Sequence, residues 1–372
     1  MKVGVITMHK VINYGSVLQA YATQEIVRKL GYECELIDYD FPNSWQFSRG
    51  VPEHKLSLKS KISKLLHLRK AYDKEPKLKR FIHTHLLMSR EYTSVDDLQN
   101  DPPLYDIYMT GSDQVWNYNF TKSDPSFLLS FAPADRPKIA FSSSFAVDSI
   151  PLELRAEMKE RLSAYSSISV REKRGQAIIK DLIGRDVPLT LDPTLVLDRD
   201  DWDKLIKAPR SKEKYIFLYM LDYAYNPAPY IYKLVKHFQE SEGLMVYSNV
   251  EMPKSLGIHY RSVAGAGIEE FMQLVRDSSL VVTSSFHGVS FSVNFGVPLL
   301  AVVPQDARSD TRLTSILEKL GLNDSIIKIN TPFENIKGGR YDEAREQLSL
   351  SKLRNESTDY LRKALDATPP KE

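Results

Sequence analysis

The sequence predicts an α/β protein built from two domains, each with a parallel β-sheet. The chain has 372 residues, more than one hydrophobic core usually supports, so two domains are expected. The first forty residues have a strand, loop, helix, strand pattern that packs as a right-handed parallel unit. A second alternating series of strands and helices begins near Ser166 and predicts the second domain.

The apolar pattern places each element in turn. The first strand is expected at Val3 to Thr7 and the second at Glu33 to Tyr39. Between them, apolar residues spaced four apart predict an amphipathic helix that ends at Gly31; they are Leu18, Ala22, Ile26 and Leu30. Further strands are expected at Asp106 to Thr110, Lys138 to Phe141, Ser167 to Val170, Tyr215 to Leu221, Leu244 to Tyr247, Leu280 to Thr283 and Leu299 to Val303.

Helical segments alternate with these strands. They are expected at Leu152 to Ala164, Pro229 to Gln239, Ile268 to Asp277, His287 to Phe295 and Thr311 to Leu320. The predicted domains are 1–165, with a helical insertion at about 41–92, and 166–340, followed by a helical tail over 341–372. The basic run Lys55 to Arg80 within the insertion is expected to be a solvated helix, with lipid headgroup contact as the alternative.

Composition excludes several classes of protein. The formal charge of +2 is too small to indicate nucleic-acid binding without a clustered patch. The single cysteine, Cys34, excludes an internal disulfide and a cysteine-based zinc site, and its apolar surroundings predict a buried thiol. The sequence has no signal-peptide pattern and no run of about 20 apolar residues, so the expected location is the cytoplasm, with the inner face of the membrane as an alternative.

Polar clusters follow several predicted strands, where open parallel sheets bind ligands. The segment His9 to Ser16 contains a glycine that permits close backbone approach, and Ser16 is the expected helix cap; a plain capped turn is the alternative. The segment Gly111 to Asn117 combines carboxylate, amide and indole groups typical of sugar sites. In the competing interpretation this segment is a polar turn with Trp116 in the core.

A third cluster, Thr283 to Gly288, passes from a strand into a helix. Its backbone N–H groups, the helix dipole and His287 are suited to holding a phosphate or protonating a reacting group. The fourth cluster is cationic, and its guanidinium groups suit carboxylates and phosphates; it contains Arg171, Arg308 and Arg312. Arg174 is expected to be a solvated surface residue. The sequence contains none of the standard dinucleotide, P-loop, zinc-protease or serine-hydrolase motifs.

Five segments in this order resemble the polysaccharide pyruvyl transferase family: Asn13 to Ala20, Gly111 to Asn117, Ser169 to Glu172, Leu191 to Thr194 and Ser285 to Gly288. The resemblance covers about residues 1–325. It implies two Rossmann-like domains facing a cleft, similar to the B-type glycosyltransferase fold. It also implies transfer of pyruvate from phosphoenolpyruvate to two sugar hydroxyls as a ketal, in exopolysaccharide, capsule or cell-wall polymer synthesis, with no further cofactor.

The implied chemistry assigns roles to the clusters. His287 is the expected general acid or phosphate contact, and Asp113 the expected base or acceptor contact. The expected donor-binding residues are Arg171, Arg308, Arg312, Ser284, Ser285 and Gly288. The expected acceptor-binding residues are Asn13, Tyr14, Gly15, Ser16, Gln114, Trp116 and Asn117. Asp192, in an Asp-Pro-Thr sequence, is expected to hold a turn with its own side chain.

Two other functions fit the same pattern. One is a nucleotide-sugar-dependent glycosyltransferase of similar fold, and the other is a non-catalytic glycan-binding protein of a polysaccharide assembly. The absence of an obvious acidic ribose-binding position disfavours the first. The sequence does not identify the acceptor, which is expected to be a sugar or a lipid-linked oligosaccharide.

Overall fold

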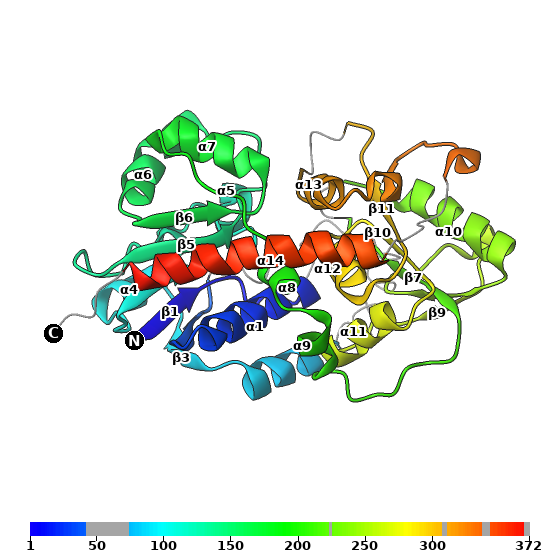
Figure 1. Ribbon diagram of the computed structural model, residues 1–372, viewed down its shortest axis with the longest axis horizontal. Helices are drawn as coiled ribbons and strands as arrows, with labels where there is room; N and C mark the ends of the chain where they lie inside the picture. Colours follow the sequence, from blue (N-terminus) through cyan, green and yellow to red (C-terminus); the bar gives the residue numbers. More distant parts are fainter. Residues whose placement is uncertain (42–73, 223–224, 307–310, 337–342, 368–372) are drawn as a thin grey trace, which may run out of the picture. The chain divides into compact units, whose positions relative to one another are not determined.

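The structure, a computed structural model, describes residues 1–41, 74–222, 225–306, 311–336 and 343–367. The chain divides into two compact units. Unit 1 comprises Met1–Lys55, Lys79–Leu197 and Lys352–Glu372, and unit 2 comprises Leu56–Leu78 and Asp198–Ser351. Within the described residues each unit contains a six-stranded parallel sheet with helices around it (Figure 1). The predicted fold class, two α/β domains with parallel sheets, is therefore confirmed.

The sheet of unit 1 has the strand order β3-β2-β1-β4-β5-β6, and all its neighbouring strands are parallel. Its central strands are apolar runs because helices cover both faces of a parallel sheet. The strands are β1 (Lys2–Ile6), β2 (Glu33–Tyr39), β3 (Met88–Tyr92), β4 (Ile107–Thr110), β5 (Lys138–Ser143) and β6 (Ser167–Val170). Cys34 lies in β2 with 1% of its surface exposed, and burial raises the pKa of its thiol.

The helices of unit 1 connect these strands. They are α1 (Tyr14–Lys29), α4 (Val95–Asn100), α5 (Tyr118–Thr121), α6 (Leu152–Ser163), α7 (Lys173–Ile183) and α8 (Pro193–Val196), with a 3-10 turn, η2, at Pro125–Leu128. Residues 74–85 are also helical, and the division between the units falls within this helix, since residues up to Leu78 belong to unit 2 and those from Lys79 onward to unit 1. The predicted first helix is confirmed, but Asn13 rather than Ser16 caps it, since the Asn13 side chain accepts from the Gly15 N–H group. Gly31 follows the helix with a φ of 91°, as a helix end of this kind requires.

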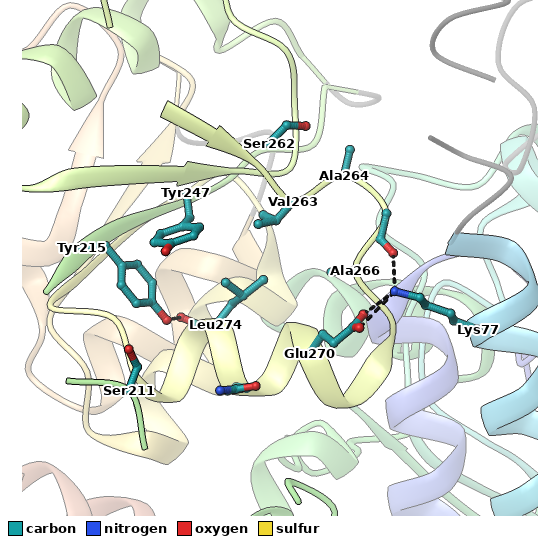
Figure 2. A pocket seen from close by; sticks show the side chains of 12 residues that line it. Lys77, Ser211, Tyr215, Tyr247, Ser262, Val263, Ala264, Ala266, Glu270 and Leu274 are labelled. Atoms are coloured by element: carbon teal, nitrogen blue, oxygen red, sulfur yellow. Dashed lines mark hydrogen bonds and ion pairs between the residues drawn. The ribbon is translucent and has the colours of Figure 1, made fainter. Parts of the chain in front are cut away.

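Unit 2 has the strand order β12-β11-β10-β7-β8-β9, again parallel throughout. Its strands are β7 (Tyr215–Tyr219), β8 (Met245–Ser248), β9 (Tyr260–Ser262), β10 (Leu280–Thr283), β11 (Leu299–Val303) and β12 (Ile326–Lys328). Its helices are α9 (Arg199–Asp203), α10 (Ala228–Glu242), α11 (Ile268–Arg276), α12 (Phe286–Phe295) and α13 (Thr311–Lys319), with 3-10 turns at Lys254–Leu256, Asn323–Ser325 and Phe333–Asn335. A pocket beside α11 is drawn in Figure 2.

The structure corrects the predicted domain boundary. The strand at Ser167–Val170 pairs with β5 in the sheet of unit 1, so the first unit continues to Leu197 rather than ending near Ser166. The predicted tail is helix α14 (Glu343–Asp366), and its part from Lys352 onward belongs to unit 1. There the Tyr360 hydroxyl donates to the Ala140 carbonyl oxygen. The chain therefore returns to the first unit after completing the second.

The predicted helical insertion at about 41–92 is also revised. Residues 42–73, which hold most of the basic run from Lys55 to Arg80, lie outside the described residues. The end of the insertion, Met88–Tyr92, is the edge strand β3 and pairs with β2. Two further edge strands, β9 and β12, and the helix α7 were not predicted.

Gly4, in the central strand β1, lies in close contact with the ring of Tyr105. A Cβ atom at this position would lie 2.0 Å from the Tyr105 ring, whose hydroxyl is held by Glu35. Gly4→Ala should therefore lower the free energy of unfolding by about 1–3 kcal/mol, the usual effect of overpacking. Urea unfolding measures this loss. In a Tyr105→Ala background the same change should cost much less, and an equal cost in both backgrounds would contradict the packing explanation.

Candidate functional site

Asp113 lies just beyond the carboxyl end of β4 and is surrounded by donors. Its Oδ2 accepts from the Ser16 hydroxyl at 2.6 Å, and its Oδ1 accepts from the Gln114 N–H group at 2.9 Å and from Arg171 Nη2 at 3.3 Å. The residue is 7% exposed, and its φ of 75° lies in the left-handed region that non-glycine residues rarely adopt. A strained backbone held by three hydrogen bonds indicates a residue whose position matters.

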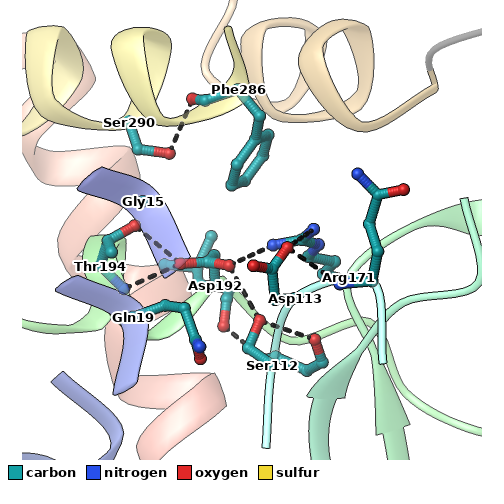
Figure 3. Close-up of polar contacts among 12 residues, drawn as sticks. Gly15, Gln19, Ser112, Asp113, Arg171, Asp192, Thr194, Phe286 and Ser290 are labelled. Carbon is teal, nitrogen blue, oxygen red and sulfur yellow. Dashed lines mark hydrogen bonds and ion pairs between the residues drawn. The ribbon is translucent and has the colours of Figure 1, made fainter. Parts of the chain in front are cut away.

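Arg171 follows β6 and contacts a second carboxylate. Its Nη1 lies 2.5 Å from Asp192 Oδ2, and the side chains of Arg171 and Asp192 are 1% and 0% exposed. Asp192 also accepts from the Ser112 hydroxyl and from the Thr194 backbone and hydroxyl. Figure 3 shows the two carboxylates, Asp113 and Asp192, converging on one guanidinium group. We call these three residues the ionic network of unit 1.

The ionic network revises the location predicted for Arg171, while its contact with a donor stays a prediction. The sequence grouped Arg171 with His287 in the second domain, as part of a clamp on an anionic donor. The structure places it in unit 1, buried between two carboxylates that already compensate its charge. Asp192, in contrast, does hold its turn as predicted, because its side chain accepts from the Thr194 N–H group at the start of α8.

The remaining predicted acceptor residues lie in the same unit. Tyr14 and Gly15 begin α1 and are buried. Gln114 accepts from the Asn117 side chain at 2.8 Å, and Asn117 caps α5; these two residues are 7% and 3% exposed. The structure therefore brings these residues to the carboxyl ends of β1 and β4, while their contact with an acceptor stays a prediction.

Trp116 does not provide a stacking surface. Its side chain packs between Phe145 and Tyr165, with ring centroids 5.0 Å and 6.0 Å away. The indole N–H group donates to the Phe127 carbonyl oxygen, and the residue is only 1% exposed. The competing interpretation from the sequence, a core tryptophan, is the correct one.

Sequence reasoning included Glu172 in a family-like segment but gave it no role, and the structure shows it 1% exposed. Its Oε1 accepts from the N–H groups of Phe145 at 2.9 Å and Ala146 at 3.4 Å. These contacts hold the loop after β5, where Ala146 has a positive φ angle; Ser142, near the end of β5, has one as well. The Ser144 N–H group in turn donates to the Asp113 carbonyl oxygen. The sequence signal that could have revealed the role of Glu172 is a carboxylate two residues after the predicted strand Ser167–Val170.

A second charged cluster lies at the ends of β1 and β2. The two ring nitrogens of His9 lie 3.2 Å from the Thr7 carbonyl oxygen and from Asp38 Oδ1, and Lys10 Nζ lies 2.9 Å from the same carboxylate. Lys10 also pairs with Glu91 in β3. Burial alone would raise the pKa of Asp38, but the hydrogen bonds from His9 and Lys10 hold it below its usual value.

In unit 2 the predicted polar residues lie where β10 meets α12. Ser285 caps the helix by accepting from the Gly288 N–H group. The Ser284 hydroxyl donates to the Leu221 carbonyl oxygen and accepts from the Leu221 N–H group. His287 lies in the first turn of α12, is 7% exposed, and packs edge-to-face on Phe286. Both serine hydroxyls thus have local partners, and their contact with the donor stays a prediction.

Of the remaining predicted arginines, Arg308 lies outside the described residues. Arg312 lies inside α13, as expected, and is 8% exposed. In the part of the chain that the structure describes, no three histidine, cysteine or acidic side chains are grouped as metal ligands would be. The described helices also include none with the length and apolarity needed to cross a membrane.

Comparison with known proteins decides the family. The family model for polysaccharide pyruvyl transferase matches residues 13–306, which include parts of both units together with Asp113, Arg171 and His287. The chain belongs to the polysaccharide pyruvyl transferase family. No curated protein matches this transferase by sequence.

Solved structures show what the fold of the transferase resembles. The glycosyltransferase SnogD from Streptomyces nogalater has 13% sequence identity and a TM-score of 0.50, with 99% of this chain and 98% of that chain covered. UDP-GlcNAc 2-epimerase from Neisseria meningitidis, bound to UDP-GlcNAc, has 10% identity and a TM-score of 0.50, with 99% and 100% covered. At these identities the likeness concerns the fold alone, and it agrees with the predicted B-type glycosyltransferase architecture.

The ionic network should be essential to the stability of the transferase. Arg171→Ala leaves two buried carboxylates without their cation, so it should lower the free energy of unfolding by about 3–5 kcal/mol. Thermal and urea unfolding measure this change. Arg174→Ala is the matched control, since Arg174 pairs with the exposed Asp148 and should cost about 1 kcal/mol or less. Wild-type stability in Arg171→Ala would contradict the structural role.

The cluster at Asp38 should stabilise the transferase in a pH-dependent way. Since the pKa of Asp38 is lower in the folded chain, its ionised form stabilises the fold above the unfolded value of about 3.9, and this contribution is lost as the pH falls below it. Asp38→Asn should therefore be less stable than wild type at pH 7, with a difference that shrinks below about pH 4. Urea unfolding across pH checks this, and a difference independent of pH would refute it.

Proposed function

We propose that this transferase moves the pyruvyl group of phosphoenolpyruvate onto two hydroxyls of a sugar, as a ketal, during synthesis of an exopolysaccharide, capsule or cell-wall polymer. One observation supports this assignment above the others: His287 lies in the first turn of α12, at the carboxyl end of β10. This position combines an imidazole with the positive end of a helix, which suits a small anion that must also receive a proton.

The reaction has a simple atomic balance. A proton is added to the methylene carbon of phosphoenolpyruvate, which becomes a methyl group, and positive charge develops at the adjacent carbon. The first sugar oxygen bonds to that carbon, and the bond to the phosphate oxygen then breaks. The second sugar oxygen closes the ketal. The two hydroxyl protons balance the proton used on the carbon and the one that leaves with phosphate, so no oxidant or metal is required by the stoichiometry.

The donor is assigned to unit 2. The first-turn N–H groups of α12 and the helix dipole stabilise the phosphate as it departs. His287 supplies the proton to the methylene carbon or holds the phosphate. Arg312 and Arg308 are the candidate partners of the donor carboxylate, since guanidinium groups bind carboxylates in a bidentate geometry. Arg171 has no part in this assignment, because its charge is used within unit 1.

The acceptor is assigned to unit 1. The Asp113 carboxylate has about four acceptor positions, and three of its hydrogen bonds are internal. It therefore retains capacity for one sugar hydroxyl, with Asn13, Gln114 and Asn117 as the neighbouring polar groups. The function requires a cytoplasmic location, or the inner face of the membrane if the acceptor is lipid-linked.

A screen of acceptors tests the proposed function. The purified protein is incubated with phosphoenolpyruvate and a set of free and lipid-linked sugars, and both phosphate release and the mass of the sugar are measured. The proposal predicts phosphate release matched by the mass gain of one pyruvyl ketal. Transfer of a sugar from a nucleotide sugar, without reaction of phosphoenolpyruvate, would support the glycosyltransferase alternative instead. Glycan binding with neither reaction would indicate a non-catalytic protein.

His287 should be needed for turnover rather than for folding. His287→Ala should lower kcat by about 10²-fold or more, the usual contribution of a general acid, with a circular dichroism spectrum like that of wild type. His259→Ala is the matched control in the same unit, because His259 is exposed and lies outside the donor assignment. Near-normal turnover in His287→Ala would refute the placement of the donor.

A further inference from the structure

Unit 2 contains a pocket that lies apart from the first turn of α12. It has a volume of about 530 Å³ and lies between helix α11 and the loop that follows β9. Figure 2 shows Tyr215 and Tyr247 at one end and the Lys77–Glu270 ion pair at the other. We call this pocket the α11 slot.

Apolar groups form much of the wall of the α11 slot. Small side chains, Ala264 and Ala266, leave the space open, and Val263 and Leu274 line it. The tyrosine rings at its end meet edge-to-face, with centroids 4.4 Å apart. The Tyr215 hydroxyl is used internally, since it donates to the Leu274 carbonyl oxygen. Tyr215 and Tyr247 are largely buried, at 4% and 7% exposed, so this end offers aliphatic carbon with a small area of aromatic ring, surfaces against which the C–H groups of a sugar ring pack.

The opposite end of the α11 slot is polar, and its two charged side chains, Lys77 and Glu270, have opposite charges. Lys77 Nζ donates to the two carboxylate oxygens of Glu270 at 3.0 Å and 2.8 Å, and to the Gly265 carbonyl oxygen at 3.1 Å. The two side chains are 45% and 53% exposed, so both can bond a ligand while remaining paired. Gln273 adds an amide to the lining. These are fixed donors and acceptors for hydroxyl groups.

The charge arrangement selects the class of ligand. The positive end of α11 is already matched by Glu269 and Glu270 in its first turn. An anionic ligand would meet the Glu270 carboxylate, and a cationic ligand would meet the Lys77 ammonium. A neutral ligand with many hydroxyl groups avoids both repulsions and can form hydrogen bonds with both Lys77 and Glu270. The volume of the slot lies within the usual range of small-molecule sites.

We propose that the α11 slot is a second carbohydrate site within unit 2, which binds a neutral glycan segment. The choice of a glycan rests on the proposed function. The slot lies away from the reacting atoms: Tyr215 begins β7, whereas Tyr219, at the other end of the same strand, accepts through its carbonyl oxygen from Thr283 beside α12. Glycan binding here is therefore separate from the chemical step.

Direct binding tests the slot without any turnover. Saturation-transfer NMR is recorded for the full-length protein, without phosphoenolpyruvate, against neutral tri- and tetrasaccharides of glucose, galactose, mannose and N-acetylglucosamine. At least one should bind wild type. Val263→Trp fills the slot and should weaken that binding by about tenfold or more. Lys77→Met, a second variant with low risk to folding, should weaken it by about fivefold.

Matched controls define the outcome. Val263→Ile keeps the slot open, and Lys207→Met removes an 82% exposed lysine that pairs with Glu269 on the same helix; both should bind like wild type. If no oligosaccharide binds, or if Val263→Trp and Lys77→Met bind like their controls, the slot proposal is overturned. Failure of the proposed function is separate, because it would appear as glycan binding without any phosphate release from phosphoenolpyruvate.

Discussion

One buried guanidinium group sets the geometry of unit 1. Arg171 lies between Asp113 and Asp192, and through them it ties the end of β6 to the end of β4 and the start of α8. The Ser16 hydroxyl adds the first turn of α1 to the same network. Removing three charges from water is costly, and such a network is stable only when its geometry and hydrogen bonds are complete. The carboxyl edge of this sheet is therefore fixed by electrostatics as well as by packing.

Unit 2 presents its polar groups differently. Its candidate donor site combines the start of α12 with the imidazole of His287, and the hydroxyls of Ser284 and Ser285 hold the local backbone. A helix dipole offers partial charge without a compensating counterion. The first turn of α12 contains no acidic residue, so its positive end can attract an anion, which is the physical reason for assigning the anionic donor to this unit.

The sequence predicted the central strands well because parallel strands buried on both faces are continuous apolar runs, as in Leu299–Val303. The edge strands β3, β9 and β12 were missed because an edge strand is short and partly polar. The domain boundary near Ser166 was wrong because a restart of the βα pattern does not reveal which sheet a strand joins. Trp116 and Arg171 show a similar limit for the site. Their residue types suggested contacts with a ligand, whereas the structure shows that both side chains are buried and bonded to other residues of the chain.

A crystal structure of the transferase with bound phosphoenolpyruvate, or with an unreactive analogue that keeps its carboxylate and phosphate, tests the division between the units most directly. The account predicts phosphate density at the first turn of α12 within hydrogen-bonding distance of His287, with the Arg171 salt bridges to Asp113 and Asp192 unchanged. Donor density on Arg171, with those salt bridges opened and α12 unoccupied, would contradict it.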